Sequence, residues 1–371
     1  MKRTRAKHVF GLLMLIPVSG WAWSGFNVFL QVDYTSAEKS VELYEGVSGR
    51  PDDIVQLRGS QIALATTALL AQQPLGAKDL ESTLEAAKFN QLSADDIFKI
   101  RDARANVSEL KELLAAVQRR NFSEKVVSTV AQLFPERTNL SASIPLFFVA
   151  FGHENIDAFV RRVTWRGNVP TFVGEGEGEL TIVVNLAKAV SYGRTVDERF
   201  IGLLSVVAHE VFHAAFGVYK DSSPTWQSYY SMRTSYLDQL LDLTQNEGIA
   251  HYLSLIQRTG GRLREDQVDK VNGAFAEFNR TATELQSKTI TPRRAGELIR
   301  HSNSSGYWES YGAITGMIVA RQIDNALGRQ ALTETIALGP ADFFAKYAKL
   351  MHQDTGLPAL NDEVMKRVGA E

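Results

Sequence analysis

Two histidines and a glutamate in one short stretch have the types and spacing needed to hold a metal ion. His209 and His213 flank Glu210 in an H-E-x-x-H sequence. On a helix, residues four positions apart lie on the same face, so both imidazoles can bind one Zn²⁺ and the glutamate can serve as general base. The residues at 201–208 are almost wholly apolar and predict a buried helix, as a water-excluding metal site requires. The alternative is a helix with two surface histidines.

A catalytic zinc site needs a third protein ligand and keeps one position open for water. The pattern H-E-x-x-H-x-x-G-x-x-H would supply that ligand from the same stretch, but Phe216 and Tyr219 occupy its last two fixed positions. A carboxylate from a second helix is the other solution, and Glu247 is the best candidate. Apolar residues at 240, 241, 243, 249, 253, 255 and 256 predict a helix around it. His251 lies four residues later on the same face. The alternatives for it are a metal ligand, a partner of the ligands and a structural histidine without a role in metal binding.

The sequence Asn-Glu-Gly-Ile-Ala at 246–250 resembles the N-E-G-F-A segment of the M1-type aminopeptidases, which belong to the gluzincin class of zinc peptidases. The similarity extends over 196–256 and, more weakly, over 307–332. It implies one Zn²⁺ per chain, bound by His209, His213 and Glu247, with Glu210 as the catalytic base.

The chain departs from the M1 enzymes in the connection between these ligands. There are 33 residues between His213 and Glu247, more than is usual in that family. We therefore expect a distant relative of the M1 enzymes rather than a member. Other side chains should orient the imidazoles, and Asn246 is a candidate for that role.

The segment 307–328 is similar to an M1 segment in which a tyrosine precedes a glycine, a helix and a leucine-glycine stop. In that family the tyrosine hydrogen-bonds the oxyanion of the tetrahedral intermediate. The register differs here, because Ala313 stands three positions before Gly316. The resemblance therefore points to Tyr311 first and Tyr307 second, while either side chain could instead pack one helix on its neighbour.

A glycine- and glutamate-rich run at 174–179 precedes the strand pattern at 180–186. At a comparable distance upstream, M1 enzymes carry a G-x-M-E-N motif whose glutamate binds the free α-amino group of the substrate. The sequence lacks that motif, and Glu175 and Glu177 are the candidates to replace it in substrate binding; a solvated loop is the alternative. In zinc peptidases of this class, an edge strand just before the H-E-x-x-H helix also binds the substrate backbone.

The remaining patterns predict the elements that position these residues. Strands are expected at 26–33, 144–151 and 180–186, and helices over most of 36–134 and 260–352. Thr195 and Glu198 form a capping box that begins the metal-binding helix, and Gly217 is expected to end it. A second helical region covers 226–257, with a break near Thr234.

Composition narrows the class of protein. Of the 371 residues, 44% are hydrophobic and 22% are charged, which is typical of a soluble globular protein. The formal net charge of −2 gives no reason to expect nucleic acid or an acidic membrane as partner. The sequence has no cysteine, so disulfides, thiolate zinc sites and cysteine nucleophiles are excluded.

The N-terminus has the three parts of a secretory signal peptide. Basic residues at 2, 3, 5 and 7 come first, then the apolar run 9–18, then small residues at 19, 20 and 22. We expect 1–23 to be removed and the protein to be periplasmic or secreted in a bacterium. An uncleaved N-terminal membrane anchor is the alternative, although the apolar run is shorter than the ~20 residues of a span. No later stretch is expected to cross a membrane.

These observations predict an α+β fold that is mostly helical, with a small mixed β-sheet packed on the H-E-x-x-H helix of a zincin-like core. We expect one domain over 24–371, with a helical part at 24–140, the catalytic core at 141–260 and a helical part at 261–371. The predicted function is zinc-dependent hydrolysis of peptides or proteins. The alternatives are a non-catalytic zinc-binding or scaffold protein and hydrolysis of a non-peptide amide or ester. The sequence patterns indicate neither the preferred substrate nor the oligomeric state.

Overall fold

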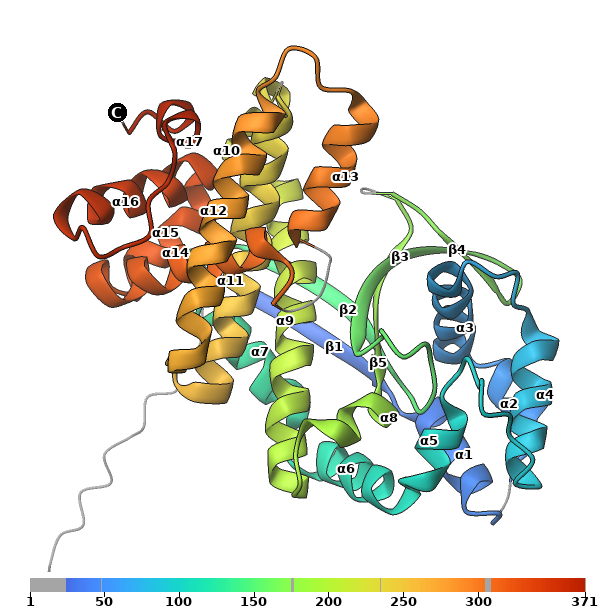
Figure 1. Cartoon of the computed structure of the whole chain (residues 1–371). Coiled ribbons are helices and arrows are strands. Elements are labelled where there is room, and N and C mark those ends of the chain that lie inside the picture. Colours follow the sequence, from blue (N-terminus) through green and yellow to red (C-terminus); the bar gives the residue numbers. More distant parts are fainter. Residues whose placement is uncertain (1–24, 48, 175–176, 234, 304–307, 371) are drawn as a thin grey trace, which may run out of the picture.

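The computed structural model describes residues 25–47, 49–174, 177–233, 235–303 and 308–370. The predicted signal peptide at 1–23 lies outside them. Most of the described chain is helical, and its strands form one five-stranded sheet (Figure 1). The predicted α+β class, mostly helical with a small mixed sheet, is confirmed.

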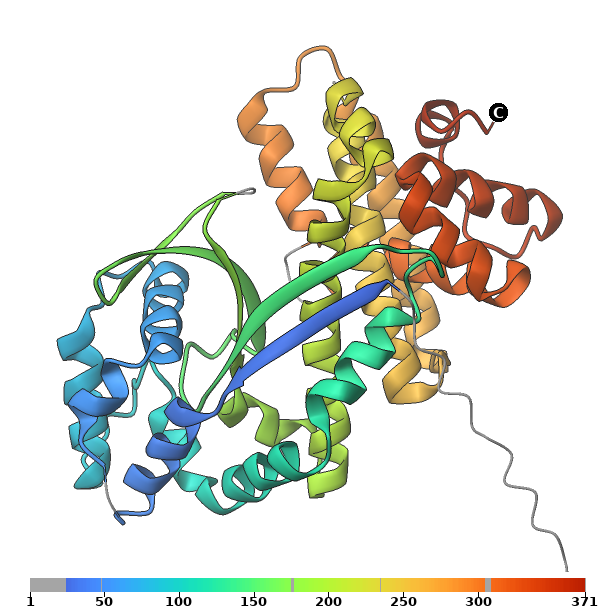
Figure 2. The same ribbon diagram turned by 180° about the vertical axis from the view of Figure 1, so that it is seen from behind.

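The sheet has the strand order β1-β2-β5-β3-β4. Its strands are β1 (Phe26–Asp33), β2 (Leu140–Val149), β3 (Ala158–Arg166), β4 (Val169–Phe172) and β5 (Glu179–Asn185). β1, β2 and β5 are parallel, whereas β3 is antiparallel to both β5 and β4. Figure 2 shows β1 and β2 side by side, although all the N-terminal helices separate them in the sequence. The helical segment between β1 and β2 is therefore a long insertion between two neighbouring strands of the sheet.

The helices of this insertion cover the sheet and the central helix. They are α1 (Thr35–Tyr44), α2 (Pro51–Val55), α3 (Arg58–Ala71), α4 (Ala77–Lys88), α5 (Ile100–Ala105), α6 (Val107–Arg119) and α7 (Phe122–Ala131). α1 and α3 pack on β2, while α6 and α7 pack on α9, the helix of the H-E-x-x-H motif. The prediction that 36–134 is mostly helical is confirmed.

The H-E-x-x-H motif lies on α9 (Val196–Ser222), which runs through the centre of the molecule (Figure 1). The Thr195 hydroxyl accepts a hydrogen bond from the Glu198 N–H, and the Glu198 carboxylate accepts one from the Thr195 N–H. This reciprocal pairing confirms the predicted capping box. α9 packs on β2, β3 and β5, so the small sheet lies against the motif helix as expected.

The prediction that α9 ends at Gly217 is wrong. A glycine ends a helix where the chain needs a left-handed residue, but Gly217 remains helical. The next turn is held by Lys220, whose ammonium group lies 4.3 Å from the ring centroids of both Phe216 and Trp226. The helix stops where Ser223 adopts an extended conformation and caps the following helix through its hydroxyl.

By length and composition α9 could also cross a membrane, contrary to the expectation that no stretch beyond the N-terminus has this character. Its surroundings give a simpler reason for its apolar sequence. It contacts the sheet on one side and α6, α7 and α11 on others. A helix that is packed from several directions in a protein core is apolar over most of its surface.

Glu247 lies on α11 (Tyr236–Thr259), which packs on α9. The elements between β5 and α11, apart from α9, are α8 (Leu186–Ala189), the 3-10 helix η1 (Val190–Tyr192) and α10 (Pro224–Met232). The predicted break in 226–257 is confirmed, because Ser235 begins α11 by forming a capping box with Asp238.

The C-terminal part is helical, as predicted. Its elements are the 3-10 helix η2 (Glu265–Gln267), α12 (Val268–Leu285), α13 (Pro292–Asn303), α14 (Tyr311–Leu327), α15 (Arg329–Leu338), α16 (Pro340–Gln353) and α17 (Asp362–Arg367). α14 packs along α11, and α12, α15 and α16 pack on α14. α11 is therefore supported by α14 as well as by α9.

The predicted strands at 26–33, 144–151 and 180–186 correspond to β1, β2 and β5. The sequence patterns do not predict β3 and β4, which form a hairpin joined by Gly167 and Asn168. Gly167 has a φ of +59°, which a two-residue hairpin turn requires. The pattern is hidden because Arg161 and Arg162 interrupt the alternation of apolar residues in β3.

Candidate metal centre

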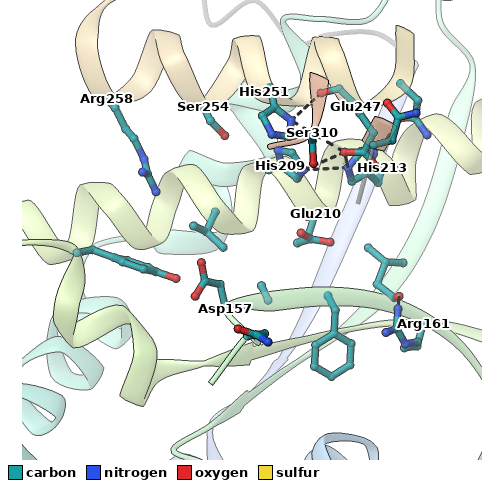
Figure 3. Close-up of a pocket in the computed structure, with 18 residues that line it drawn as sticks. Asp157, Arg161, His209, Glu210, His213, Glu247, His251, Ser254, Arg258 and Ser310 are labelled. Carbon is teal, nitrogen blue, oxygen red and sulfur yellow. Dashed lines mark hydrogen bonds and ion pairs between the residues drawn. The ribbon is translucent and has the colours of Figure 1, made fainter. Parts of the chain in front are cut away.

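Three side chains from α9 and α11 converge on one point. The Nε2 atoms of His209 and His213 are 2.9 Å apart. Glu247 Oε2 lies 3.7 Å from Nε2 of His209 and 3.3 Å from Nε2 of His213. Figure 3 shows these side chains facing one another above Glu210. The i, i+4 spacing places both imidazoles on one face of α9, and Glu247 meets them from α11.

This group fits a zinc ion in geometry and chemistry. Ligand atoms about 2.0–2.1 Å from a tetrahedral Zn²⁺ lie about 3.3–3.4 Å from one another. The three separations in the structure, 2.9, 3.3 and 3.7 Å, bracket that value. Two imidazoles and one carboxylate also form the ligand set of known catalytic zinc sites. These residues could therefore hold one metal ion.

Asn246 contacts one imidazole from outside the group. Its Oδ1 lies 3.0 Å from Nδ1 of His213. A hydrogen bond to an amide oxygen places the proton on Nδ1, which leaves the lone pair of Nε2 directed toward Glu247. Asn246 thus has the position predicted for a residue that orients a metal-binding histidine.

His251 lies beside the group without joining it. Its Nδ1 is 2.9 Å from the backbone oxygen of Glu247 and 4.0 Å from Glu247 Oε2. Its ring centroid lies 5.0 Å from that of His209. Burial, assisted by the charge of His209, lowers the pKa of His251 to about 3. His251 is therefore a neutral neighbour, whereas Glu247 is brought to both histidines.

The carboxylate and the imidazoles shift one another's pKa values. Burial disfavours the charge on Glu247, but His213 and His209 outweigh burial and hold the pKa of this carboxyl well below its usual value. Burial also opposes the charge on His213, but the Glu247 carboxylate outweighs it and raises the pKa of His213 to about 9. Without a metal ion, a proton on His213 and the negative charge of Glu247 therefore stabilise each other, and a metal cation would take the place of that proton.

Glu210 faces the pocket next to this group (Figure 3). Burial raises the pKa of its carboxyl, and the charges of His209 and His213 offset part of that rise. A carboxyl group with a raised pKa is better able to take up and return a proton near neutral pH. Among the described residues, Glu210 has no hydrogen-bond or ion-pair partner, so its carboxylate is available to a bound molecule.

The group lies in a pocket of about 710 Å³ formed mainly by α9, α11 and β3. Charged side chains of both signs line it. In Figure 3, Asp157 and Arg258 lie toward one end and Arg161 toward the other, with Glu210 between them. Charged groups therefore lie at both ends of a pocket whose lining also contains apolar side chains such as Phe159 and Val206.

The edge of β3 that borders this pocket is partly unpaired. On one side, β5 pairs with 158–163; on the other, the pairing of β4 covers only 163–166. The Arg162 carbonyl accepts a hydrogen bond from the Val173 N–H on the β4 side. Because successive residues of a strand direct their backbone groups to opposite neighbours, Ala158 and Val160 face the same side as Arg162. Their backbone groups therefore lie on the open edge.

The strand that directly precedes α9 in the sequence is not this edge strand. β5 lies between β2 and β3 in the sheet. The expectation of an edge strand just before the H-E-x-x-H helix is therefore wrong in sequence order. β4 is the last strand on that side of the sheet, and the earlier strand β3 provides the open edge because β4 pairs only with 163–166.

Tyr311 does not reach the metal-binding group. Its hydroxyl lies 2.9 Å from the Thr281 hydroxyl and donates to the Leu298 carbonyl at 3.3 Å. It is buried and does not line the pocket. The oxyanion role that the resemblance implied for Tyr311 does not fit this position, because α14 turns the side chain toward α12 and α13. Tyr307, the second candidate, lies outside the described residues.

Of the two candidate glutamates in the glycine-rich run, the structure describes Glu177 alone, and it is not brought to the pocket. Glu177 is exposed in the connection between β4 and β5 and does not line the pocket, while Glu175 lies outside the described residues. Asp157 is instead the carboxylate that lines the far end of the pocket. Sequence reasoning missed it because it directly precedes the unpredicted strand β3. The Gly167-Asn168 turn was the signal that could have revealed this strand.

Comparison with known proteins agrees with the geometry. Residues 52–356 match the model of a family described as "Putative zinc dependent peptidase (DUF5700)". Searches of the curated proteins and of the solved structures gave no match. The matched range spans most of the chain and contains both α9 and α11. The chain therefore belongs to the DUF5700 family, whose description is that of a zinc-dependent peptidase.

Proposed function

We propose that this protein hydrolyses peptide bonds with one zinc ion held by His209, His213 and Glu247, and with Glu210 as general base. The observation that carries the proposal is the convergence of these side chains, from two helices, in a pocket bordered by an open strand edge. A third ligand supplied by a second helix is the gluzincin arrangement, so we also propose that α9, α11 and the sheet form a zincin-like core. The family description supports the same class of activity.

Different residues of the chain are assigned to metal binding and to proton transfer. A bound Zn²⁺ supplies a Lewis acid and makes a water molecule acidic enough to ionise near neutral pH. Glu210 takes the proton from the attacking water and later gives it to the leaving amine. The raised pKa of Glu210 favours the second of these transfers. Asn246 holds the ring of His213 in the orientation that metal binding requires.

The open edge of β3 gives a peptide a place to bind. The backbone groups of Ala158 and the N–H of Val160 face that edge and can hydrogen-bond to an extended chain, whereas the Val160 carbonyl already accepts a hydrogen bond from Arg161. Such a chain would lie between β3 and α9, and thus alongside Glu210. This placement favours a peptide or protein substrate over a small amide or ester, which would leave the edge unused.

Zinc content and cleavage of an unfolded protein together test the proposal. We would measure zinc by mass spectrometry and casein cleavage for the native chain, for Glu210→Gln and for Glu112→Gln, a matched change at an exposed glutamate of α6. We expect about one zinc in each protein, with cleavage lost only in Glu210→Gln, because removal of a general base costs about 10²–10⁴-fold in rate. Zinc binding without cleavage by the native chain would favour a non-catalytic zinc-binding protein. Absence of zinc would refute the assignment of all three ligands.

A further inference from the structure

Arg161 on β3 is a partly buried cation at one end of the pocket. Its guanidinium lies 5.1 Å from the ring centroid of Phe159 and 5.5 Å from that of Phe172. These aromatic contacts restrict a side chain that is otherwise flexible. The guanidinium is therefore held in a defined place next to the metal-binding group.

Arg161 has no carboxylate partner among the described residues. Its one hydrogen bond there is donated by Nη1 to the Val160 carbonyl, at 2.9 Å. The charge of Glu210 favours the charged form of Arg161, although the two side chains form no ion pair. Burial lowers the pKa of Arg161, because removal from water disfavours the charged guanidinium.

Two other arginines near β3 are paired, whereas Arg166, at the exposed end of the strand, lies in solvent. Arg162, the next residue, forms an ion pair with Asp221 at 3.3 Å, and Arg58 forms one with Glu179 at 2.5 Å while its guanidinium stacks on Trp165. Arg161 differs from Arg162 and Arg58 because it has no carboxylate partner in the described part of the chain, and it differs from Arg166 because it is partly buried at the pocket. A planar guanidinium with several unused N–H groups is well suited to a carboxylate.

The single hydrogen bond of Arg161 lies where the substrate is proposed to bind. The Val160 carbonyl faces the open edge of β3, so the guanidinium of Arg161 reaches around that edge. An extended peptide that pairs with β3 would place its own groups against this guanidinium. Asp157 and Arg258 line the opposite end of the pocket, so Arg161 is the cation at its own end.

We propose that Arg161 binds a carboxylate of the peptide substrate and thereby makes the enzyme selective for it. The carboxylate is either the side chain of an aspartate or glutamate or the C-terminal carboxylate of the peptide. This inference rests on the proposed peptide binding at the edge of β3. It assigns Arg161 to specificity and leaves bond cleavage to the metal-binding group and Glu210.

Peptide binding to an uncleaving variant tests this inference separately from catalysis. The probes are fluorescein-labelled polyalanine hexapeptides that carry one glutamate or, in its place, one glutamine at each position in turn. Each is prepared with a free C-terminal carboxylate and with a C-terminal amide. Fluorescence anisotropy would give the dissociation constants for zinc-loaded Glu210→Gln, alone and combined with Arg161→Met. Arg166→Met, an exposed arginine in the same strand, is the matched control.

We expect one carboxylate position to strengthen binding by about 10-fold or more, as a charge-assisted bidentate contact does. Arg161→Met should remove this preference, and Arg166→Met should retain it. Preference for glutamate over glutamine identifies an acidic side chain, whereas preference for the free acid over the amide identifies the C-terminus. Equal binding of all probes, no binding of any probe, or a preference that survives Arg161→Met would overturn the inference. Cleavage of casein without any carboxylate preference would leave the proposed function standing and refute only the role of Arg161.

Discussion

Gly248 on α11 and Gly316 on α14 bring the backbones of their helices into direct contact. A Cβ atom on Gly248 would lie 2.3 Å from Cα of Gly316, and one on Gly316 would lie 2.0 Å from the Thr244 carbonyl oxygen. Neither position therefore accepts a side chain unless the helices separate. Because Glu247 directly precedes Gly248, this contact helps to hold the turn of α11 that carries Glu247.

Gly316→Ala should therefore weaken metal binding from a position outside the pocket. The added methyl group must push α14 from α11, which we expect to cost about 1–3 kcal/mol in free energy of unfolding, as overpacking does. Differential scanning calorimetry with and without zinc would measure the loss of stability and the smaller stabilisation by zinc. Gly273→Ala is the control, because a Cβ atom there meets nothing within 4 Å, and it should stabilise α12 slightly. Unchanged stability in Gly316→Ala would contradict the close contact.

Glu247→Gln should lose zinc almost completely, while His251→Asn should retain it. Glu247 Oε2 lies within 3.7 Å of both imidazoles, whereas His251 directs Nδ1 at the backbone of its own helix. Zinc analysis of the two purified variants after dialysis would decide between them. The opposite result would make His251 the third ligand.

Asn246→Ala should lower zinc affinity by about 10–100-fold, the usual effect of removing a residue that orients a metal ligand. The hydrogen bond from Nδ1 of His213 to Oδ1 of Asn246 would be lost, and the ring would be free to turn. Competition with a chromophoric chelator would measure the affinity. Asn246→Asp keeps an oxygen acceptor and should restore most of it; equal loss in both variants would argue against the orienting role.

Tyr311→Phe should affect stability more than catalysis. The hydroxyl contacts Thr281 and the Leu298 carbonyl, so its removal should cost about 1 kcal/mol in free energy of unfolding. Urea unfolding and steady-state cleavage of a peptide would measure the two effects, and the turnover rate should stay within about twofold of the native value, because the hydroxyl is remote from the site. A loss of most of the cleavage activity in a variant that still folds and binds zinc would restore the oxyanion role.

The ion pair between Asp238 and Arg367 should stabilise the folded protein at neutral pH and should lose this effect in acid. Burial disfavours the charge of Asp238, but hydrogen bonds from Arg367 and Ser235 outweigh it and lower the pKa of the carboxyl. A lowered pKa in the folded state means that the unfolded chain binds the proton more tightly. The stabilisation is therefore present above the unfolded-state pKa of about 3.9 and is lost as pH falls below it.

Asp238→Asn should accordingly lower the free energy of unfolding by about 1–3 kcal/mol at pH 7, and the difference from the native chain should shrink toward pH 3.5. Urea unfolding at several pH values would show the trend. Arg367→Gln should reproduce the loss at pH 7, and the double variant should not be additive, because both changes remove one contact. A difference that grows as pH falls would contradict this account.

The site residues could be predicted from the sequence where spacing along one helix determines position. His209, Glu210 and His213 depend only on helical periodicity, and Glu247 was found because Asn246 and Gly248 flank it in a recognisable pattern. Tyr311 could not be placed in the same way. The direction of its side chain depends on how α14 packs against α12 and α13, and no local sequence pattern predicts that packing.

The fold was predictable where strands are buried on both faces and read as apolar runs. β2 and β5 are of this kind, since β1 and β3 flank them and helices cover them. The strand β3 was not predicted because part of one of its edges borders the pocket and is not paired with another strand. Its charged residues, Arg161 and Arg162, follow from that exposure and weaken the strand pattern.

The unpaired edge of β3 also bears on self-association of the protein. An exposed strand edge is a template on which a second copy of the same chain can add, and such additions lead to aggregation. The guanidinium of Arg161 covers the Val160 carbonyl, and Arg162 adds a second positive charge beside it. Two identical edges would therefore meet with like charges opposed. The two arginines leave this edge accessible to other polypeptide chains but disfavour pairing between the edges of two copies of the protein.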